Sequence, residues 1–358
     1  MVLLSLGAVF TTSICCTTPQ KPSAPSALQP NQNADATWPW PAATKVDRAK
    51  GFRHWNAKGT DGSSLDLLEF DFHENPRLCF SIYDQDQDDA QPFDNRADYF
   101  PRGVGQVASS LNRDKRVLAA WNGLFFGYDR GPGSPPKGWA NHIGPVVLNG
   151  KPYFNVGRHR WTFGAKDGRF KAIFKPDFKQ LASEFDFAAD GAQLLIHQGM
   201  PLRIQPFQDS INRKRVADTP EDAGSIPIVD WMKTSRCSMA WSKDGRFFWV
   251  LVVIEADHEV GSKLAVKYGK HDPSGWTLFD LQTFWQKRNA WSAINSDGGI
   301  VTQLALTNPN HSWEVIASQQ SSQPQRRVYS NPVQSPDGGS LLTFFMYEKS
   351  ATDFDPNK

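Results

Sequence analysis

Short apolar runs separated by turn residues dominate the chain after about residue 55, and this alternation most limits what it can fold into. Two segments repeat the same turn chemistry, residues 165–170 (AKDGRF) and 242–247 (SKDGRF). Asp-Gly between strand-like runs favours a tight hairpin, because glycine readily adopts the positive φ that such turns need. We interpret both segments as antiparallel hairpins and not as a repeated unit.

Other strands are predicted from hydrophobic patterning. Residues 65–72 (LDLLEFDF) nearly alternate apolar and polar side chains, which predicts a half-buried strand, and residues 78–83 are expected to pair with it. Residues 247–254 (FFWVLVVI) are continuously apolar, which indicates a central strand. Residues 116–121 and 290–295 are predicted strands as well.

Few helices are expected. Residues 277–288 form the clearest one, because Thr277 can cap its N-terminus and Asp280 follows three residues later. The apolar side chains Leu278, Leu281 and Trp285 lie on one face of that helix. Residues 104–111 predict a second, short helix. The expected class is therefore α+β, with mixed, largely antiparallel sheets and a few packed helices.

The N-terminal region differs from the rest of the chain. Residues 1–16 are apolar and uncharged, which resembles the apolar part of a signal peptide without its positive segment. Cys15 or Cys16 would suit a lipid anchor, although Ile14 fits poorly before such a cysteine. Residues 17–45 are rich in Pro, Ser, Ala, Asn and Gln, which predicts a disordered linker.

This organisation predicts an exported protein that is periplasmic, secreted or lipid-anchored at the cell envelope. The folded domain is expected over residues 46–348, with a frayed tail over 349–358. Beyond the leader only Cys79 and Cys237 remain. They could form one disulfide or stay as two separate buried thiols.

Composition excludes several classes of protein. The 358 residues include 39 Lys and Arg and 37 Asp and Glu, so the net charge is +2. This balance argues against a nucleic-acid binder that works by bulk charge. No apolar run approaches the roughly 18 residues of a membrane span, which excludes a polytopic membrane protein.

Three short motifs favour a structural interpretation. Residues 84–89 (DQDQDD) begin like a calcium loop, but Asp89 and Asn95 stand where Gly and Glu are required, so a solvated acidic loop is expected. Residues 103–108 imitate a dinucleotide fingerprint without the strand that should precede it. Residues 255–259 (EADHE) match no metal-ligand spacing. We expect no metal and no cofactor.

Asp297, Gly298 and Gly299 form a more informative triplet, because a carboxylate here ends a predicted buried strand. Two glycines let the backbone turn sharply and let a ligand approach the main chain. Their successive N–H groups could form an anion nest. The triplet alone is also compatible with an ordinary turn.

Five segments in order resemble the motifs of the phosphodiester glycosidase family. They are residues 118–126 (LAAWNGLFF), 144–150 (GPVVLNG), 192–199 (a loose match), 236–240 (RCSMA) before the hairpin at 243–245, and 275–278 (GWTL) followed by a helix and 293–301 (AINSDGGIV). Each motif is short, and the ordered set over about residues 65–345 makes the resemblance specific. Ile300 and Val301 replace a Gly and a Ser of the family pattern, and Cys237 and Ala240 replace a Thr and a Gly.

The resemblance implies an enzyme that releases a sugar from a phosphodiester at the anomeric carbon. The leaving group is a phosphate monoester with a second pKa of about 6, so it needs less protonation than an alcohol does. Asp297 is implied as the base on water or the stabiliser of an oxocarbenium-like centre. Arg236 is implied as a bidentate fork on the phosphate, with a structural ion pair as the alternative.

Further residues are implied to complete the site. Asn122 is expected to be catalytic and Asn295 to bind substrate, each by holding sugar hydroxyls or by orienting Asp297. The amides of Gly298 and Gly299 would add an anion contact. The expected partner is a phosphorylated sugar or glycan and no nucleic acid, with a membrane tether through the N-terminus and the oligomeric state left open.

Two other functions remain open from the sequence. One is a non-catalytic glycan-binding or envelope-associated domain on the same scaffold, which Ile300 and Val301 favour. The other is a hydrolase of related wall or exopolysaccharide linkages. Free reducing sugar released from a sugar-1-phospho-sugar would separate an enzyme from a binder. All of these hypotheses require that four polar side chains lie close together in the fold, namely Asn122, Arg236, Asn295 and Asp297.

Overall fold

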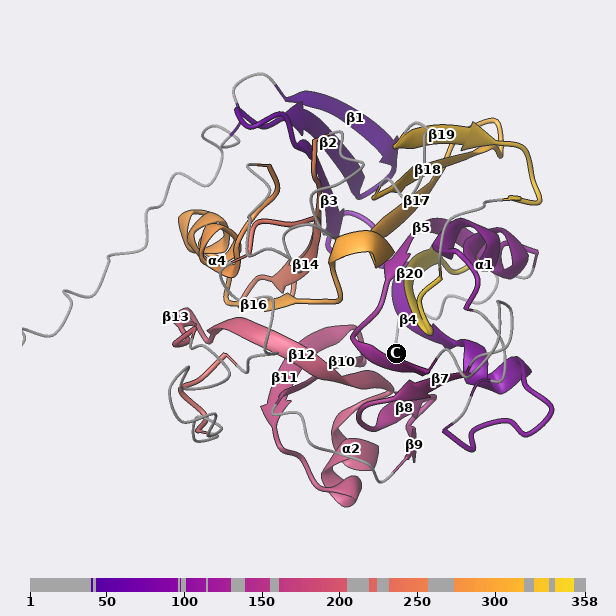
Figure 1. The fold of residues 1–358 in the computed structure, drawn as a ribbon, viewed down its shortest axis with the longest axis vertical. Helices are drawn as coiled ribbons and strands as arrows, with labels where there is room; N and C mark the ends of the chain where they lie inside the picture. Colours follow the sequence, from indigo (N-terminus) through magenta and orange to yellow (C-terminus); the bar gives the residue numbers. More distant parts are fainter. Residues whose placement is uncertain are drawn as a thin grey trace, which may run out of the picture. The chain divides into compact units, whose positions relative to one another are not determined.

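Antiparallel strands form two large sheets in the structure (Figure 1). The computed structural model describes Trp40 and residues 43–95, 97, 101–113, 115–129, 139–154, 161–204, 219–223, 232–256, 274–318, 325–334 and 339–350. Residues Thr37–Lys358 form one compact unit. The predicted α+β class, with largely antiparallel sheets and a few helices, is confirmed.

The larger sheet has twelve strands, nine of which follow the path β1-β2-β3-β15-β14-β16-β12-β10-β11, while β13 pairs with β12 and β8 lies between β12 and β9. The bounds are β1 Thr44–Ala49, β2 Phe52–Lys58, β3 Ser64–Asp71, β8 Val146–Leu148, β9 Lys151–Tyr153, β10 Trp161–Lys166, β11 Arg169–Phe174, β12 Phe187–His197, β13 Met200–Pro201, β14 Arg236–Trp241, β15 Phe247–Ile254 and β16 Ser292–Asn295. Strand β1 thus begins two residues before the predicted start of the domain at residue 46.

The smaller sheet has six strands in the order β19-β18-β17-β5-β20-β4. The bounds are β4 Leu78–Asp84, β5 Arg116–Asn122, β17 Gln303–Thr307, β18 Trp313–Ala317, β19 Arg326–Tyr329 and β20 Leu342–Glu348. Strands β6 (Phe126–Asp129) and β7 (Trp139–His142) form a separate pair.

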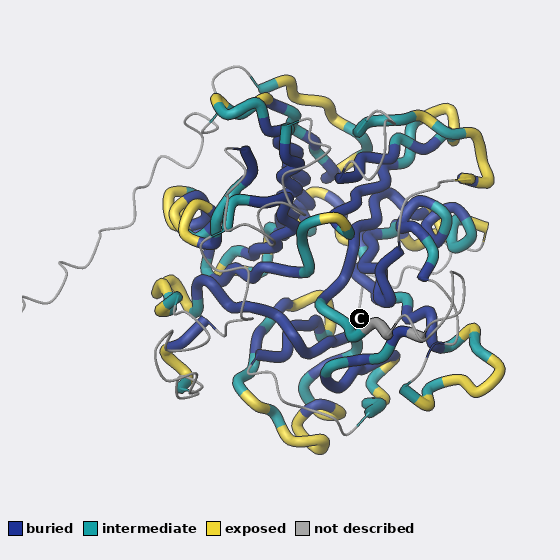
Figure 2. The backbone as a smooth tube through the Cα atoms, in the orientation of Figure 1, coloured by how far each residue is buried: buried dark blue, intermediate teal, exposed yellow. Residues whose placement is uncertain are grey.

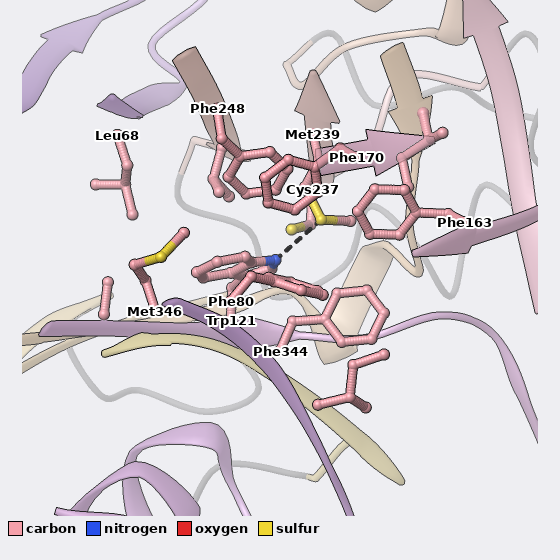
Figure 3. Close-up of a cluster of buried hydrophobic side chains, with 14 of the residues drawn as sticks. Leu68, Phe80, Trp121, Phe163, Phe170, Cys237, Met239, Phe248, Phe344 and Met346 are labelled. Carbon is pink, nitrogen blue, oxygen red and sulfur yellow. Dashed lines mark hydrogen bonds between the residues drawn. The ribbon is translucent and has the colours of Figure 1, made fainter. Parts of the chain in front are cut away.

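The main hydrophobic core lies between the two sheets. Trp121 of β5 and Phe80 of β4 meet Phe248 of β15 there, and the Trp121 indole donates to the Met239 sulfur at 3.1 Å (Figure 3). Strand β15 is buried on both faces, because alternate residues enter this core while Trp249 and its companions belong to a second buried cluster. Buried backbone fills the middle of the molecule, and exposed backbone lies mainly at its periphery (Figure 2). The prediction of a central strand at 247–254 is confirmed.

Helices cover the outer faces of the two sheets. Helix α4 (Leu278–Lys287) buries Leu281 and Trp285 in the cluster that lies on the outer face of the larger sheet. Helix α1 (Val104–Leu111) packs on the smaller sheet, and α2 (Phe178–Glu184) packs on β8 and β12 through Leu181. The predicted helix and its cap are confirmed, since the Thr277 hydroxyl accepts from the Asp280 N–H at 3.1 Å.

The two predicted Asp-Gly hairpins are also confirmed. Strands β10 and β11 are joined by Asp167 and Gly168, whose φ angles of 48° and 72° are those of a two-residue turn with the strand-matched twist. Strands β14 and β15 are joined by a longer loop in which Gly245 has a φ of 73°.

The predicted pairing of residues 65–72 with 78–83 is wrong. Strand β4 lies in the other sheet and pairs with β20, because residues 72–77 carry the chain from one sheet to the other. Strand β3 is also buried on both faces instead of one. Its acidic side chains are tolerated there because arginines pair with them, as Arg326 does with Asp66 and Arg246 with Asp71.

The solvated acidic loop expected at residues 84–89 is only partly correct. Asp84 and Asp86 are buried at the start of the 3-10 helix η1 (Gln85–Asp88), where the His142 Nε2 lies 3.1 Å from Asp84 Oδ2. Burial raises the pKa of Asp86 to about 6. Among the described residues, no group of three or more His, Cys, Asp or Glu side chains could hold a metal ion.

Other sequence-based predictions have mixed outcomes. Cys79 and Cys237 are two separate free thiols. Residues 257–259 of the acidic cluster, the leader at 1–16 and the linker up to residue 39 lie outside the described residues. Within the described part of the chain, no helix is long and apolar enough to cross a membrane.

Candidate functional site

Three strand ends that are far apart in the sequence meet around Asp297. Strand β5 ends at Asn122, whose Nδ2 donates to the Asp297 carbonyl oxygen at 2.7 Å. The Asp297 N–H in turn donates to the Gly123 carbonyl oxygen at 3.3 Å. These bonds tie the Asn-Gly motif of one sheet to the Asp-Gly-Gly motif that follows β16 of the other.

The same segment lies against the start of β14. The Ser296 N–H donates to the Cys237 carbonyl oxygen and the Gly299 N–H to the Ser235 carbonyl oxygen, both at 2.8 Å. A Cβ built on Gly298 would lie 2.8 Å from the Ser235 oxygen, which is closer than a real Cβ can approach. Glycine is therefore required here for backbone packing.

This packing corrects the expected anion nest. The Gly298 N–H donates to Oδ1 of Asp297 at 2.8 Å, and the Gly299 N–H is bonded to the Ser235 carbonyl. Both amides are thus engaged within the protein and do not project together toward a ligand. The left-handed φ of Gly299, 65°, instead turns the chain into the short helix η2 (Gly299–Val301).

The two asparagines act on the backbone in this structure. Asn122 is fully buried, and its Oδ1 accepts from the Gln303 N–H at 3.0 Å while its Nδ2 holds Asp297. Asn295 is also fully buried, and its Nδ2 donates to Gln193 Oε1 at 2.7 Å. The geometry fits the orienting role that was one of the two expectations for Asn122. Both side chains are fully buried, so neither exposes an atom to a sugar hydroxyl, and Asn295 Oδ1 has no hydrogen-bond partner among the described residues.

Arg236 is placed differently from the phosphate fork that was expected. Its side chain is fully buried, and it donates to the carbonyl oxygens of Trp276 at 2.9 Å and Met232 at 2.7 Å. The Arg236 Cδ lies 3.7 Å from a Cβ built on Gly298, so the residue still borders the Asp-Gly-Gly segment. Its guanidinium therefore holds the backbone beside the site.

Asp297 is the partly accessible carboxyl of this group, since Asn122, Arg236 and Asn295 are completely buried around it. Burial raises the pKa of Asp297 to about 7, and the hydrogen bond from the Gly298 N–H opposes this effect. No cationic side chain of the described residues lowers it. A carboxyl with a pKa near neutrality can accept or donate a proton under ordinary conditions.

A second carboxyl with the same properties was missed by the sequence analysis. Asp190 of β12 is 7% exposed, and its Oδ1 accepts from the Gly191 N–H at 2.6 Å. Burial raises its pKa to about 7, against the effect of that hydrogen bond. The signal in the sequence was the dipeptide Asp190-Gly191, which repeats the local chemistry of Asp297-Gly298.

Strand register brings the two carboxyls to one region. The last β12–β16 pair is Gln193 with Asn295, and the strands are antiparallel, so Asp190 and Asp297 both lie just beyond the same end of this ladder. The segment after Asn122 joins them. Its Gly123 carbonyl accepts from Asp297, and its Phe125 carbonyl lies 3.8 Å from a Cβ built on Gly191.

An exposed apolar side chain borders the site. Ile300 is 48% exposed on η2, three residues after Asp297, where the resembled family has a glycine. A single exposed apolar side chain is common on protein surfaces. Its position in the sequence makes Ile300 a residue to test for contact with a ligand.

No protein-family model matches the chain, and no curated protein matches it. Among solved structures, it is similar to the zebrafish N-acetylglucosamine-1-phosphodiester alpha-N-acetylglucosaminidase catalytic domain auto-inhibited by its pro-peptide, with 18% identity and a TM-score of 0.47 over 86% of this chain and 82% of that one. A hypothetical protein from Synechocystis has 12% identity and a TM-score of 0.46, over 86% and 64% of the two chains. A protein from Burkholderia pseudomallei has 10% identity and a TM-score of 0.44, over 81% and 75%. With every TM-score below 0.5, these likenesses carry no conclusion about activity.

Proposed function

We propose that this chain is an exported glycosidase that hydrolyses sugar-1-phosphodiester linkages, with Asp297 as the reacting carboxyl. One observation carries the proposal. The segments that resemble the phosphodiester glycosidase motifs, at 118–126, 236–240 and 293–301, are joined by hydrogen bonds around a partly accessible carboxyl whose pKa is raised to about 7. Buried polar networks of this kind hold a reactive group in one orientation.

In the proposed reaction, Asp297 takes a proton from a water molecule that attacks the anomeric carbon. The bond between that carbon and the phosphate oxygen breaks, the sugar keeps the oxygen of the water, and the phosphate monoester leaves. Asp297 acts in its ionised form, so the rate should rise with pH through about 7. Asp190 is the second carboxyl, and it donates a proton to the leaving phosphate oxygen or holds a sugar hydroxyl.

The buried residues around Asp297 are positioning residues in this scheme. Asn122 fixes the main chain of Asp297, and Arg236 fixes the strand end on which Gly298 packs. The phosphate is then compensated by groups other than the Gly298 and Gly299 amides, which are already bonded.

The test uses the full chain with methyl phosphodiesters of several sugar 1-phosphates, and it measures the release of reducing sugar. Wild type should release sugar, and Asp297→Asn should lower kcat by about 10²- to 10⁴-fold, the range for loss of a general base. Asp167→Asn is the matched control, because it changes an Asp-Gly pair in an exposed hairpin turn where Asn also tolerates a positive φ. Full activity in Asp297→Asn would show that Asp297 is structural.

A non-catalytic glycan-binding domain is the second candidate function. Two observations favour it. Arg236 and the N–H groups of Gly298 and Gly299 already form hydrogen bonds within the protein, and Ile300 is exposed. A binder would show saturable affinity for the same phosphodiesters by calorimetry without any release of reducing sugar, and Asp297→Asn would leave that affinity nearly unchanged.

A further inference from the structure

A cavity lies at the opposite end of β5 from Asn122. Its volume is about 400 Å³, which falls in the range of small-molecule sites. It is lined by the first residues of β5, by β1 and β2, and by the turn between β17 and β18. Leu118 is the lining residue of β5 nearest to Asn122, and the four residue steps between them span roughly 13 Å at about 3.3 Å per residue.

The lining of this cavity is strongly basic. Four cationic side chains, Arg48, Arg113, Lys115 and Arg116, contribute to it together with His311, and none of its described lining residues is acidic. This concentration contrasts with a net charge of only +2 for the whole chain. A concave surface with one sign of charge concentrates ligands of the opposite sign.

Arg48 forms a fixed part of the wall. Its side chain is 9% exposed, its Nη1 donates to Asn308 Oδ1 at 2.8 Å, and Glu314 pairs with its Nη2. Its Nε is buried and bonded to no described residue. A buried N–H group without an acceptor costs folding free energy, so a ligand that supplies an acceptor at this point would be favoured.

The opposite rim is equally well defined. The Asn308 N–H donates to the Ser312 carbonyl and the His311 N–H to the Asn308 carbonyl, both at 2.9 Å, so the turn that carries His311 is closed by its own hydrogen bonds. Arg113 and Arg116 are exposed. Glu348 pairs with Nη1 of Arg116, whereas Arg113 makes no ion pair with a described residue. Arg113 can therefore reach a ligand without losing an ion pair, and Arg116 would share its guanidinium between Glu348 and the ligand.

We propose that this cavity binds the phosphate group of a phosphorylated sugar or glycan, at a site separate from Asp297. Several guanidinium and ammonium donors on different sides suit the oxygens of a phosphate. Among the lining residues that the structure describes, Phe52 is the only Phe, Tyr or Trp and is 1% exposed, so these residues offer a nucleobase no ring of these types to stack on. The concave shape favours a soluble sugar phosphate over a flat lipid surface.

The probes are glucose 1-phosphate and inorganic phosphate, titrated into the full-length Asp297→Asn variant at low salt. Calorimetry should show saturable binding of both, weakened by added NaCl. The double variant Arg113→Gln/Arg116→Gln in the same background should bind at least about 10-fold more weakly, as expected when two charge-assisted contacts are lost. Arg169→Gln is the matched control, because Arg169 is exposed on β11 and does not line the cavity.

Three results would overturn this proposal. The first is that neither probe binds at millimolar concentration. The second is that the double variant binds the probes as tightly as its parent does. The third is that glucose 1-phosphate does not bind, while vesicles containing phosphatidylglycerol capture the protein in a way that depends on Arg113 and Arg116. The proposed hydrolysis is judged separately with Arg113→Gln/Arg116→Gln made in the wild-type background, which keeps Asp297 and should release reducing sugar at the wild-type rate from a saturating phosphodiester.

Discussion

Two groups of carboxyls lie in or beside the larger sheet, and their surroundings differ in charge. On β3, burial raises the pKa of Asp66, but the hydrogen bond from His54 and the charge of Arg326 outweigh burial and hold it below its ordinary value. Asp71 of the same strand is likewise lowered, because the Arg246 ion pair and backbone N–H groups outweigh burial. These carboxyls are ionised and paired.

At the end of β12 and β16 the balance is reversed. Burial raises the pKa of Asp190 and of Asp297 to about 7, and each has only the N–H of the following glycine to oppose it. A carboxylate that serves only the fold is usually given a cation, as on β3. Buried carboxyls without one are more typical of sites where protons are exchanged.

The largest change in stability is expected from Asp66→Asn, which tests the paired group of carboxyls. The change leaves Arg326 and His54 without the buried charge that they surround, so the free energy of unfolding at pH 7 should fall by about 3 kcal/mol. Urea denaturation measures this. The pKa of Asp66 is lowered, so its contribution is present above pH 4 and is lost as pH falls through its folded value; the variant should therefore be less acid-sensitive than wild type. If the urea midpoint of Asp66→Asn at pH 7 equalled that of the wild type, the ion pairs on β3 would not distinguish its carboxyls from Asp190 and Asp297.

A smaller effect of opposite sign is expected from Asp190→Asn. A raised carboxyl pKa means that the folded state holds a proton that the unfolded state has lost, so wild-type stability should fall as pH rises from about 4 to 7. Asn keeps an acceptor for the Gly191 N–H and cannot ionise. The free energy of unfolding of the variant, compared with that of the wild type, should therefore be more favourable at pH 8 than at pH 5, by at most about 3 kcal/mol.

Thermal melts between pH 5 and 8 check this prediction. Asp186→Asn is the control, since that half-buried carboxyl lies in the adjoining loop, where its Oδ2 accepts from the Asp167 N–H at 2.9 Å. A parallel pH dependence of wild type and Asp190→Asn would mean that Asp190 is ionised in the folded protein, as the β3 carboxyls are.

The smallest effect is expected at Ile300. Ile300→Ser should leave stability within about 0.5 kcal/mol, because the side chain is 48% exposed. It should raise the KM for a phosphodiester with an apolar group and change the KM for a polar one less. Steady-state kinetics with the two substrates measure the ratio, and an identical KM change for both would place Ile300 outside the site.

Local pattern was sufficient for several elements of this fold. The Thr277 cap, the 104–111 helix, the two Asp-Gly hairpins and the 247–254 strand depend on residues within a few positions of one another, and all of them are present. The partner of β4 was not predictable, because residues 78–83 would pair equally well with any strand of matching pattern. Asp190 was missed because nothing local distinguishes a buried Asp-Gly from a turn.

The sequence by itself determined which segments become strands and helices and which short motifs carry polar groups, since both depend on periodicity and on the backbone preferences of Gly, Asp and Thr. Only the tertiary structure decided which polar atoms are free for a ligand. Asn122 and Asp297 are 175 positions apart, and their hydrogen bond exists because two sheets pack face to face. In the same packing, the Gly298 and Gly299 amides form hydrogen bonds, Arg236 is buried and Asp297 stays partly accessible. The sequence alone could not determine this, because burial and hydrogen bonding depend on residues that are distant in the chain and become neighbours only in the folded protein.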